Sequence, residues 1–141
     1  MNIDSITNGI VIDHITAGRG MLLYKLLGLE KIQSPVALIM NVNSKKKGKK
    51  DIIKIDGDIA VNFDVIGYVD PTATVNIING GKLAEKKNIP LPFKLNNVVK
   101  CKNPRCITSV EQELDHIFKL TDKQNRVYRC IYCETKANSH F

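Results

Sequence analysis

Runs of aliphatic residues, separated by turn-forming residues, predict four strands before Gly80. β-branched residues are frequent in these runs, as is typical of strands that pack in a sheet. A lysine-rich turn over 44–50 joins the second run to the third, so these two are expected to form a hairpin. The predicted strands are 9–15, 36–42, 50–55 and 73–78.

Two segments between these strands are predicted to be helices. Leucines recur on one face of a helix over 21–29, with Thr16 as a candidate cap and Gly28 near its end. The segment 59–69 fits two patterns, because its apolar residues alternate like a strand and also recur at helical spacing. Asp58 in front of it, and the need to cover a sheet, favour the helix.

The order strand–helix–strand–strand–helix–strand is that of a ferredoxin-like split β-α-β domain, an antiparallel sheet with helices on one face. Pro90 and Pro92 indicate an extended connector, because proline lacks a backbone donor and disfavours helix in the residue before it. We therefore expect an α+β chain of two domains, the first over 1–92 and an all-β domain over 93–141.

All four cysteines lie in the second of these domains. Cys101 and Cys106 are separated by four residues, Cys130 and Cys133 by two, and a strand–turn–strand pattern lies between the pairs. Two such pairs supply four thiolates at the corners of a tetrahedron, so a zinc ribbon with one structural ion is expected. Four thiolates leave no position for a water nucleophile. Two disulfides, or four unligated buried cysteines, are the alternatives.

Composition adds two constraints. The hydrophobic fraction of 43% and charged fraction of 25% are those of a globular chain, and no apolar run approaches the roughly 20 residues of a membrane span. Polar residues interrupt the first eight positions, which argues against a secretory signal, so a cytoplasmic location is expected. The net charge of +7 arises mainly before Cys101, where 14 basic residues oppose 9 acidic ones.

Candidate chemistry in the first domain centres on Asp13 and His14. Neighbours on a strand point to opposite faces, so the two side chains are not expected to form an acid–base dyad, and a strand-end pair is the simpler interpretation. The sequence has no phosphate-binding glycine loop, no serine elbow and no cysteine in this domain. We therefore expect no catalytic activity.

The lysines allow a binding site instead. Lys54, together with Lys86 and Lys87 in the strand after Gly80-Gly81, would suit a polyphosphate with a ribose if their strands neighbour that of Asp13. The alternative is that the lysines form a solvated face, and the run over 45–50 is expected to be a mobile, solvated turn.

Several of these segments together resemble one known family. They occur in the same order and at similar separations in the regulatory chain of aspartate carbamoyltransferase, and the resemblance extends from about Ile6 to Glu134. The cysteine spacing alone is shared with many zinc ribbons, but its combination with the other segments is far more specific. The matching segments are Val11-Ile12-Asp13-His14-Ile15, Lys50-Asp51-Ile52-Ile53-Lys54-Ile55, Ala73-Thr74-Val75-Asn76 with Ile78, and the four cysteines.

The resemblance implies a non-catalytic subunit that modulates the first committed step of pyrimidine biosynthesis. In the family, the first domain binds ATP, CTP or UTP and forms a homodimer through its sheet, while the zinc domain contacts the catalytic chain. Ribose is then expected at Asp13 and Lys54, phosphates at His14 and Lys86, and the base near Ile78 and Leu83. The implied nucleotide-binding residues are Asp13, His14, Ile52, Lys54, Asn76, Ile78, Gly81, Leu83 and Lys86, and the implied metal ligands are Cys101, Cys106, Cys130 and Cys133.

Two other functions compete with this interpretation. A small basic zinc ribbon could bind nucleic acid, but the second domain carries few basic residues in excess and no stripe of aromatic and basic side chains, so we expect no nucleic-acid partner. Steeply salt-dependent binding to RNA or DNA would favour that rival. A stand-alone nucleotide-hydrolysing enzyme is a weaker alternative, which a turnover assay would test.

Overall fold

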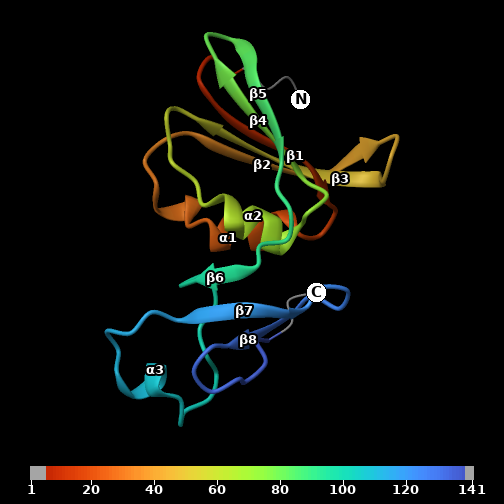
Figure 1. Ribbon diagram of the computed structural model, residues 1–141. Helices are drawn as coiled ribbons and strands as arrows, with labels where there is room; N and C mark the ends of the chain where they lie inside the picture. Colours follow the sequence, from red (N-terminus) through yellow and green to blue (C-terminus); the bar gives the residue numbers. More distant parts are fainter. Residues whose placement is uncertain (1–5, 139–141) are drawn as a thin grey trace. The chain divides into compact units, whose positions relative to one another are not determined.

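The computed structural model describes residues 6–138 and divides the chain into two compact units. The first ends at Pro90 and the second begins at Leu91. Each unit has a sheet of its own (Figure 1).

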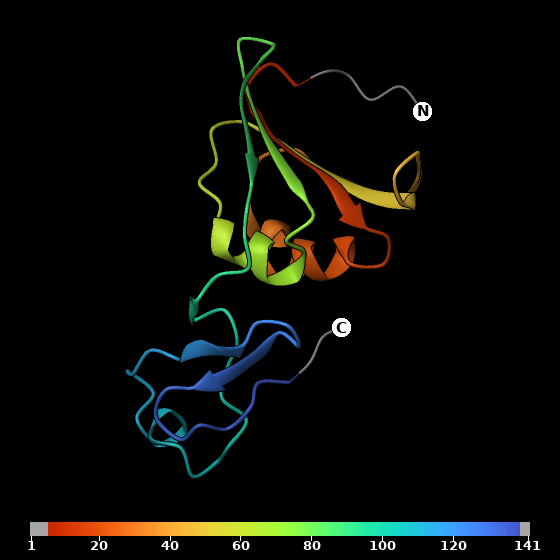
Figure 2. The same ribbon diagram turned by 45° about the vertical axis from the view of Figure 1, so that its right-hand side comes forward.

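The first unit is a five-stranded antiparallel sheet in the order β2-β3-β1-β4-β5. Its helices α1 and α2 lie on the same face of the sheet (Figures 1 and 2). This is the predicted α+β arrangement, with β5 added at one edge. The elements are β1 (Gly9–Thr16), α1 (Gly20–Leu26), a 3-10 turn (Leu29–Lys31), β2 (Val36–Ser44), β3 (Gly48–Asp56), α2 (Phe63–Val69), β4 (Thr74–Asn79) and β5 (Lys82–Asn88).

Successive residues along each strand point to opposite faces of this sheet, and the two faces differ in burial. One set is buried under the helices, namely Ile10, Ile12, Ile53, Ile55 and Val75. The residues between them, such as Val11, Lys54 and Asn76, are only half-buried and belong to the opposite face, which neither α1 nor α2 covers. We call this opposite side the open face.

Both helices have an N-cap other than the one that the sequence predicts. Thr16 is the last residue of β1 rather than a cap, and α1 begins after Arg19, whose side chain makes no capping bond. For α2, the predicted cap Asp58 lies in a loop. The cap is instead Asn62, whose side chain accepts a hydrogen bond from the Asp64 N–H at 3.0 Å. Both predicted cap positions are thus wrong, although the cap of α2 is of a residue type that the rules favour.

Helix α2 packs closely against the end of the first unit. A Cβ at Gly67 would lie 2.2 Å from the carbonyl oxygen of Pro90 and 2.9 Å from a side-chain carbon of Ile89. Only glycine fits there, because the backbone of the helix and the backbone of the departing chain are in direct contact.

Two of the irregularities in the sheet flank Asp51. The pairing of β1 with β3 shifts between Ile12 and Ile15, and that of β2 with β3 shifts between Ile39 and Val42. His14 and Asn41, one in each bulge, have positive φ values of 59° and 62°. An extra residue in one strand is what produces such a kink.

The side chain of Asp51 is fully buried and connects these distortions. Its carboxylate accepts hydrogen bonds from the backbone N–H groups of Gly18 (3.1 Å), Gly20 (2.9 Å) and Asn41 (3.0 Å). A Cβ at Gly20 would lie 2.7 Å from the carboxylate, so glycine is required for this approach. One carboxylate therefore holds both the β1–α1 loop and the bulge in β2.

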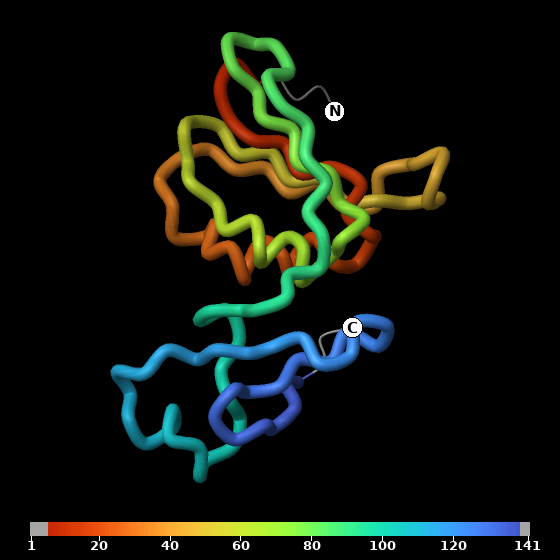
Figure 3. The backbone as a smooth tube through the Cα atoms, viewed as in Figure 1, coloured from red at the N-terminus to blue at the C-terminus, as the bar shows by residue number. Residues whose placement is uncertain are grey.

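The lysine-rich segment is mostly strand rather than turn. The hairpin of β2 and β3 includes residues up to Ser44 and from Gly48, so only 45–47 are left as the turn. The tip of this hairpin projects beyond the rest of the sheet, next to the end of β1 (Figure 3).

The second unit is a three-stranded antiparallel sheet with one short helix. The predicted strand–turn–strand pattern corresponds to β7 (Ile117–Asp122) and β8 (Val127–Cys130), and β6 (Lys94–Asn96) pairs with β7. The helix α3 (Ile107–Val110) follows Cys106. Leu95, Phe118 and Tyr128 form a small core, and the Tyr128 hydroxyl donates to the carbonyl of Pro92 at 2.5 Å.

No helix among residues 6–138 has the length and apolar character needed to cross a membrane.

Replacing Asp51 with Ala is expected to lower the free energy of unfolding of the first unit by about 3 kcal/mol, because three buried N–H donors lose their acceptor. The exposed Asp56, on the same strand, is the matched control. Urea denaturation followed by circular dichroism measures the difference. Equal midpoints for Asp51→Ala and Asp56→Ala would show that the carboxylate has no such role.

Candidate functional sites

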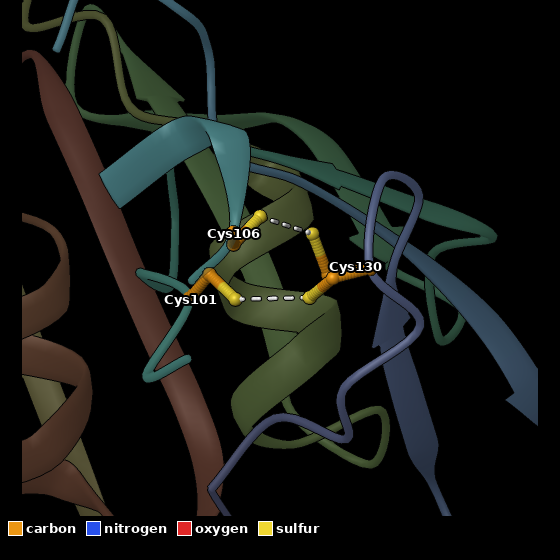
Figure 4. A group of neighbouring side chains, drawn as sticks. Cys101, Cys106 and Cys130 are labelled. Atoms are coloured by element: carbon orange, nitrogen blue, oxygen red, sulfur yellow. Dashed lines mark hydrogen bonds between the residues drawn. The ribbon is translucent and has the colours of Figure 1, made fainter. Parts of the chain in front are cut away.

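The four cysteine sulfurs lie within 4.8 Å of one another. Cys101 and Cys133 are 3.5 Å apart, and Cys106 and Cys130 are 3.7 Å apart, so each short distance joins one sulfur of the first pair to one of the second. Figure 4 shows the sulfurs of Cys101, Cys106 and Cys130 facing a common centre. A tetrahedral ion with metal–sulfur bonds of about 2.3 Å has sulfur–sulfur edges of roughly 3.8 Å, so the observed distances fit a metal ion.

Hydrogen bonds hold the first cysteine pair in place. The Cys101 N–H donates to His116 Nδ1 at 3.0 Å, and the Cys106 N–H donates to the carbonyl of Asn103 at 3.1 Å. The Thr108 hydroxyl donates to Cys106 Sγ at 3.1 Å. His116 therefore supports the backbone of the site instead of supplying a ligand, and the thiolates receive the neighbouring interactions typical of a metal site.

The thiols differ in their acidity. Burial raises the pKa of Cys101 to about 12. The pKa of Cys133 is lowered to about 6, first by the Thr135 hydroxyl 3.2 Å from its sulfur. Of these two thiols, Cys133 therefore ionises the more readily, and a divalent ion would displace a proton from Cys101 as it binds.

The second site is the open face of the first unit. Cross-strand pairs place Lys54 of β3 opposite Val11, Val11 opposite Asn76 of β4, and Asn76 opposite Lys86 of β5. These four residues form one row across four strands, with a lysine at each end. Directly opposed residues on one face have Cβ atoms about 5 Å apart, so the row presents its polar groups to one ligand-sized area.

Asp13 lies one step along the open face from this row, and a lysine holds it. Lys50 Nζ is 3.0 Å from Asp13 Oδ1. Burial alone would raise the pKa of Asp13, but the Lys50 ammonium and the His14 N–H, which donates at 2.6 Å, lower it below its ordinary value. Asp13 is therefore an ionised acceptor beside a cation.

The bulge changes the relation between Asp13 and His14. Strict alternation would direct the two side chains to opposite faces, yet His14 Nδ1 lies 4.0 Å from Asp13 Oδ2 because the backbone at His14 is left-handed. The expectation of opposite faces is thus wrong for this pair. The distance is too long for a hydrogen bond, and within 6–138 the buried Nδ1 atom has no hydrogen-bond partner.

The other residues implied for nucleotide binding lie around this row. Ile78 of β4 pairs with Leu83 of β5 and with Gly9 of β1, beyond Asn76 on the same face. Gly81 is in the β4–β5 turn with φ of 77°, and its N–H donates to the Thr7 carbonyl at 2.7 Å. Ile52 is half-buried in β3, two residues before Lys54.

Sequence reasoning overlooked two lysines near this face. Lys50 contacts Asp13 directly, and Lys47 reaches the end of β1, where its Nζ lies 2.7 Å from the carbonyl oxygen of His14. Both belong to the segment that was expected to be a solvated turn, and for these two residues that expectation is wrong. No local pattern distinguishes these two lysines from the others in the segment, because their partners His14 and Asp13 lie more than 30 residues away in the sequence.

A cavity of about 780 Å³ lies elsewhere in the first unit. It is bordered by the beginning of β1, the β3–α2 loop and the end of β4, and Ile78 is the only residue it shares with the nine residues implied for nucleotide binding. Its polar lining includes Asp56 and Asp58 but no lysine or arginine from the described residues. Those carboxylates would repel a triphosphate, so this cavity is not the phosphate site.

Comparison with known proteins agrees with the division into two units. Residues 1–90 match the family described as "Aspartate carbamoyltransferase regulatory chain, allosteric domain", and residues 94–140 match "Aspartate carbamoyltransferase regulatory chain, metal binding domain".

Similar proteins cover nearly the whole chain. The aspartate carbamoyltransferase regulatory chain of Clostridium botulinum is 51% identical over 134 residues, which is 95% of this chain and 92% of the relative. That of Clostridium tetani is 51% identical over 135 residues, covering 95% and 94%. That of Bifidobacterium longum is 42% identical over 137 residues, covering 97% and 99%. The chain therefore belongs to the family of aspartate carbamoyltransferase regulatory chains, the non-catalytic subunits of that enzyme.

Proposed function

We propose that the open face of the first unit binds ATP, CTP or UTP and that occupancy of this face regulates the catalytic chain. The observation that carries the proposal is the row from Lys54 to Lys86, which has Asp13 beside it and no helix over it. Lysine ammonium groups suit phosphate charge, and an ionised carboxylate accepts hydrogen bonds from ribose hydroxyls.

Each residue has a distinct part in this proposal. Lys54 and Asp13 hold the ribose, while Lys86 and His14 lie by the phosphates and Asn76 adds a hydrogen bond between them. Ile78 and Leu83, which pair across β4 and β5, border the base together with Gly81, and Ile52 completes the apolar side. A nucleotide shifts the catalytic assembly only by as much as it prefers one quaternary state, typically about 1–3 kcal/mol. Through that shift the chain modulates the first committed step of pyrimidine biosynthesis.

The metal ion at the four cysteines is zinc, on this proposal, with one ion per chain. Zinc prefers tetrahedral thiolate sites, and four protein sulfurs close the coordination sphere, so the ion is structural. We place the protein in the cytoplasm, where thiols remain reduced and free to bind metal.

The second unit is proposed to dock on the catalytic chain through an apolar surface close to the cysteines. Val110 is 67% exposed and Ile107 45% exposed on α3, and Ile131 and Tyr132, between the last two cysteines, are 43% and 45% exposed. Large apolar side chains in such numbers on so small a unit favour a protein partner. The metal ion fixes the loops that present them.

A homodimer is proposed to form through the sheet of the first unit. β2 is an edge strand, so among the described residues no strand neighbours it on one side, and it carries apolar residues, including the 52% exposed Met40. The other edge, β5, is mostly charged. An aliphatic edge strand is the better template for pairing with a second copy.

Replacing Lys86 with Ala is expected to weaken nucleotide binding roughly 10-fold to 100-fold, because a charge-assisted hydrogen bond to phosphate is lost. Lys87→Ala is the matched control. Lys87 is the next residue of β5, but it pairs with the buried Val75 and so belongs to the other face of the strand. Titration calorimetry with CTP and ATP measures both. Equal affinities for Lys86→Ala and the unmodified chain would remove the phosphate site from the open face.

Replacing Cys133 with Ala is expected to abolish zinc binding and assembly with the catalytic chain, while Lys123→Ala in the β7–β8 turn leaves both intact. Elemental analysis of the purified chains measures the metal, and gel filtration with the catalytic chain measures assembly. A normal complex formed by metal-free Cys133→Ala would refute the structural role of the ion.

A further inference from the structure

Lys47 connects three separate parts of the first unit. Its Nζ contacts the His14 carbonyl oxygen at 2.7 Å, the Thr16 hydroxyl at 3.4 Å and the Thr72 hydroxyl. It also lies 3.9 Å from a carboxylate oxygen of Asp70. The β2–β3 hairpin, the end of β1 and the turn from α2 to β4 are thus joined by one side chain.

The carboxylate of Asp70 anchors the other end of this connection. Asp70 is 1% exposed and follows the last residue of α2. It accepts hydrogen bonds from the Thr16 N–H at 2.6 Å and from the Thr72 N–H and hydroxyl at 2.9 and 2.5 Å. Burial alone would raise its pKa, but the Thr72 hydroxyl and the Thr16 N–H lower it below its ordinary value. An ionised buried group of this kind needs a cation nearby, and Lys47 supplies it.

Lys47 differs from Lys50 in how many of its ammonium donors already form hydrogen bonds. An ammonium group has three donors, and Lys47 has three oxygen acceptors, so none remains for a phosphate. Within residues 6–138, Lys50 has one partner, Asp13, and keeps donors for a ligand. Lys47 therefore has a different task from the lysines of the open face.

We propose that Lys47 is a positioning residue for the nucleotide site: it fastens the His14 carbonyl to the Thr72–Asp70 turn and so holds the left-handed bulge that presents Asp13 and His14. This inference rests on the nucleotide site proposed above. It also gives the site a physical link to the end of α2, since Asp70 directly follows that helix.

The first test measures nucleotide affinity by calorimetry on the full, zinc-loaded chain with CTP and with ATP. Lys47→Met keeps the length of the side chain but removes its charge, and roughly five- to tenfold weaker binding is expected. Lys46→Met removes the same charge at the exposed hairpin tip and is expected to change affinity by less than about twofold. Lys47→Arg keeps a cationic donor and should restore most of the affinity.

Thr72→Val distinguishes positioning from direct contact. Thr72 is a partner of Lys47 that is not among the residues of the open face, so weaker nucleotide binding in this variant supports the connection. The double variant should lose less than the product of the two single losses, because both changes break one interaction. If Lys47→Met binds weakly while Thr72→Val binds normally, Lys47 is a direct phosphate ligand and the inference is wrong. It is also wrong if Lys47→Met binds as the unmodified chain does.

A measurement without nucleotide keeps this inference separate from the proposed function. Amide resonances of Asp13 and His14 in the ligand-free chain are expected to shift in Lys47→Met and in Thr72→Val, and to stay in place in Lys46→Met. Unchanged resonances in the first two variants would overturn the positioning role. Failure of the unmodified chain to bind any nucleotide would instead overturn the proposed function and leave this spectroscopic result to decide on Lys47.

Discussion

The buried carboxylate of Asp51 is the constraint on which the geometry of the first unit depends. It satisfies backbone N–H groups from the β1–α1 loop and from the bulge in β2, two segments that have no secondary-structure partner for those donors. Because the carboxylate lies on β3 between two bulges, the strands are kinked at the same level of the sheet. The kink in β1 is where Asp13 and His14 are found, so a purely internal interaction shapes the part of the molecule that faces a ligand.

The second unit depends on a different kind of constraint. Its core is small, and its loops are drawn together at the sulfurs instead of over a large apolar surface. The strand that carries Cys130 also carries Tyr128, whose hydroxyl reaches back to Pro92. Metal coordination and the first residues of this unit are thus tied to the same short strand.

Much of this architecture follows from local sequence signals. The strands of the first unit could be predicted because their β-branched runs end at glycine, proline or asparagine, and the cysteine site because each pair is close in sequence. The helix caps were misplaced, since Asp58 and Asn62 are equally good cap residues and only the path of the loop selects the second. Lys47 was misjudged for another reason, because its partner Thr72 lies 25 residues away and no local pattern announces it.

The open face was predictable only in part. Alternation shows which residues share a face, but not which strands are neighbours, so the row from Lys54 to Lys86 became visible only in the pairing of four strands. The approach of His14 to Asp13 could not be foreseen, because a bulge reverses the alternation on which the sequence argument relied.

The glycine in α2 has a mechanical consequence. This helix has seven residues, or about 10 Å of rise, and its backbone at Gly67 lies close to the backbone carbonyl of Pro90. A contact between side chains can absorb small displacements by rotamer changes, whereas a contact between two backbones cannot. A tilt of α2 would therefore displace the backbone at Pro90, where the first unit ends.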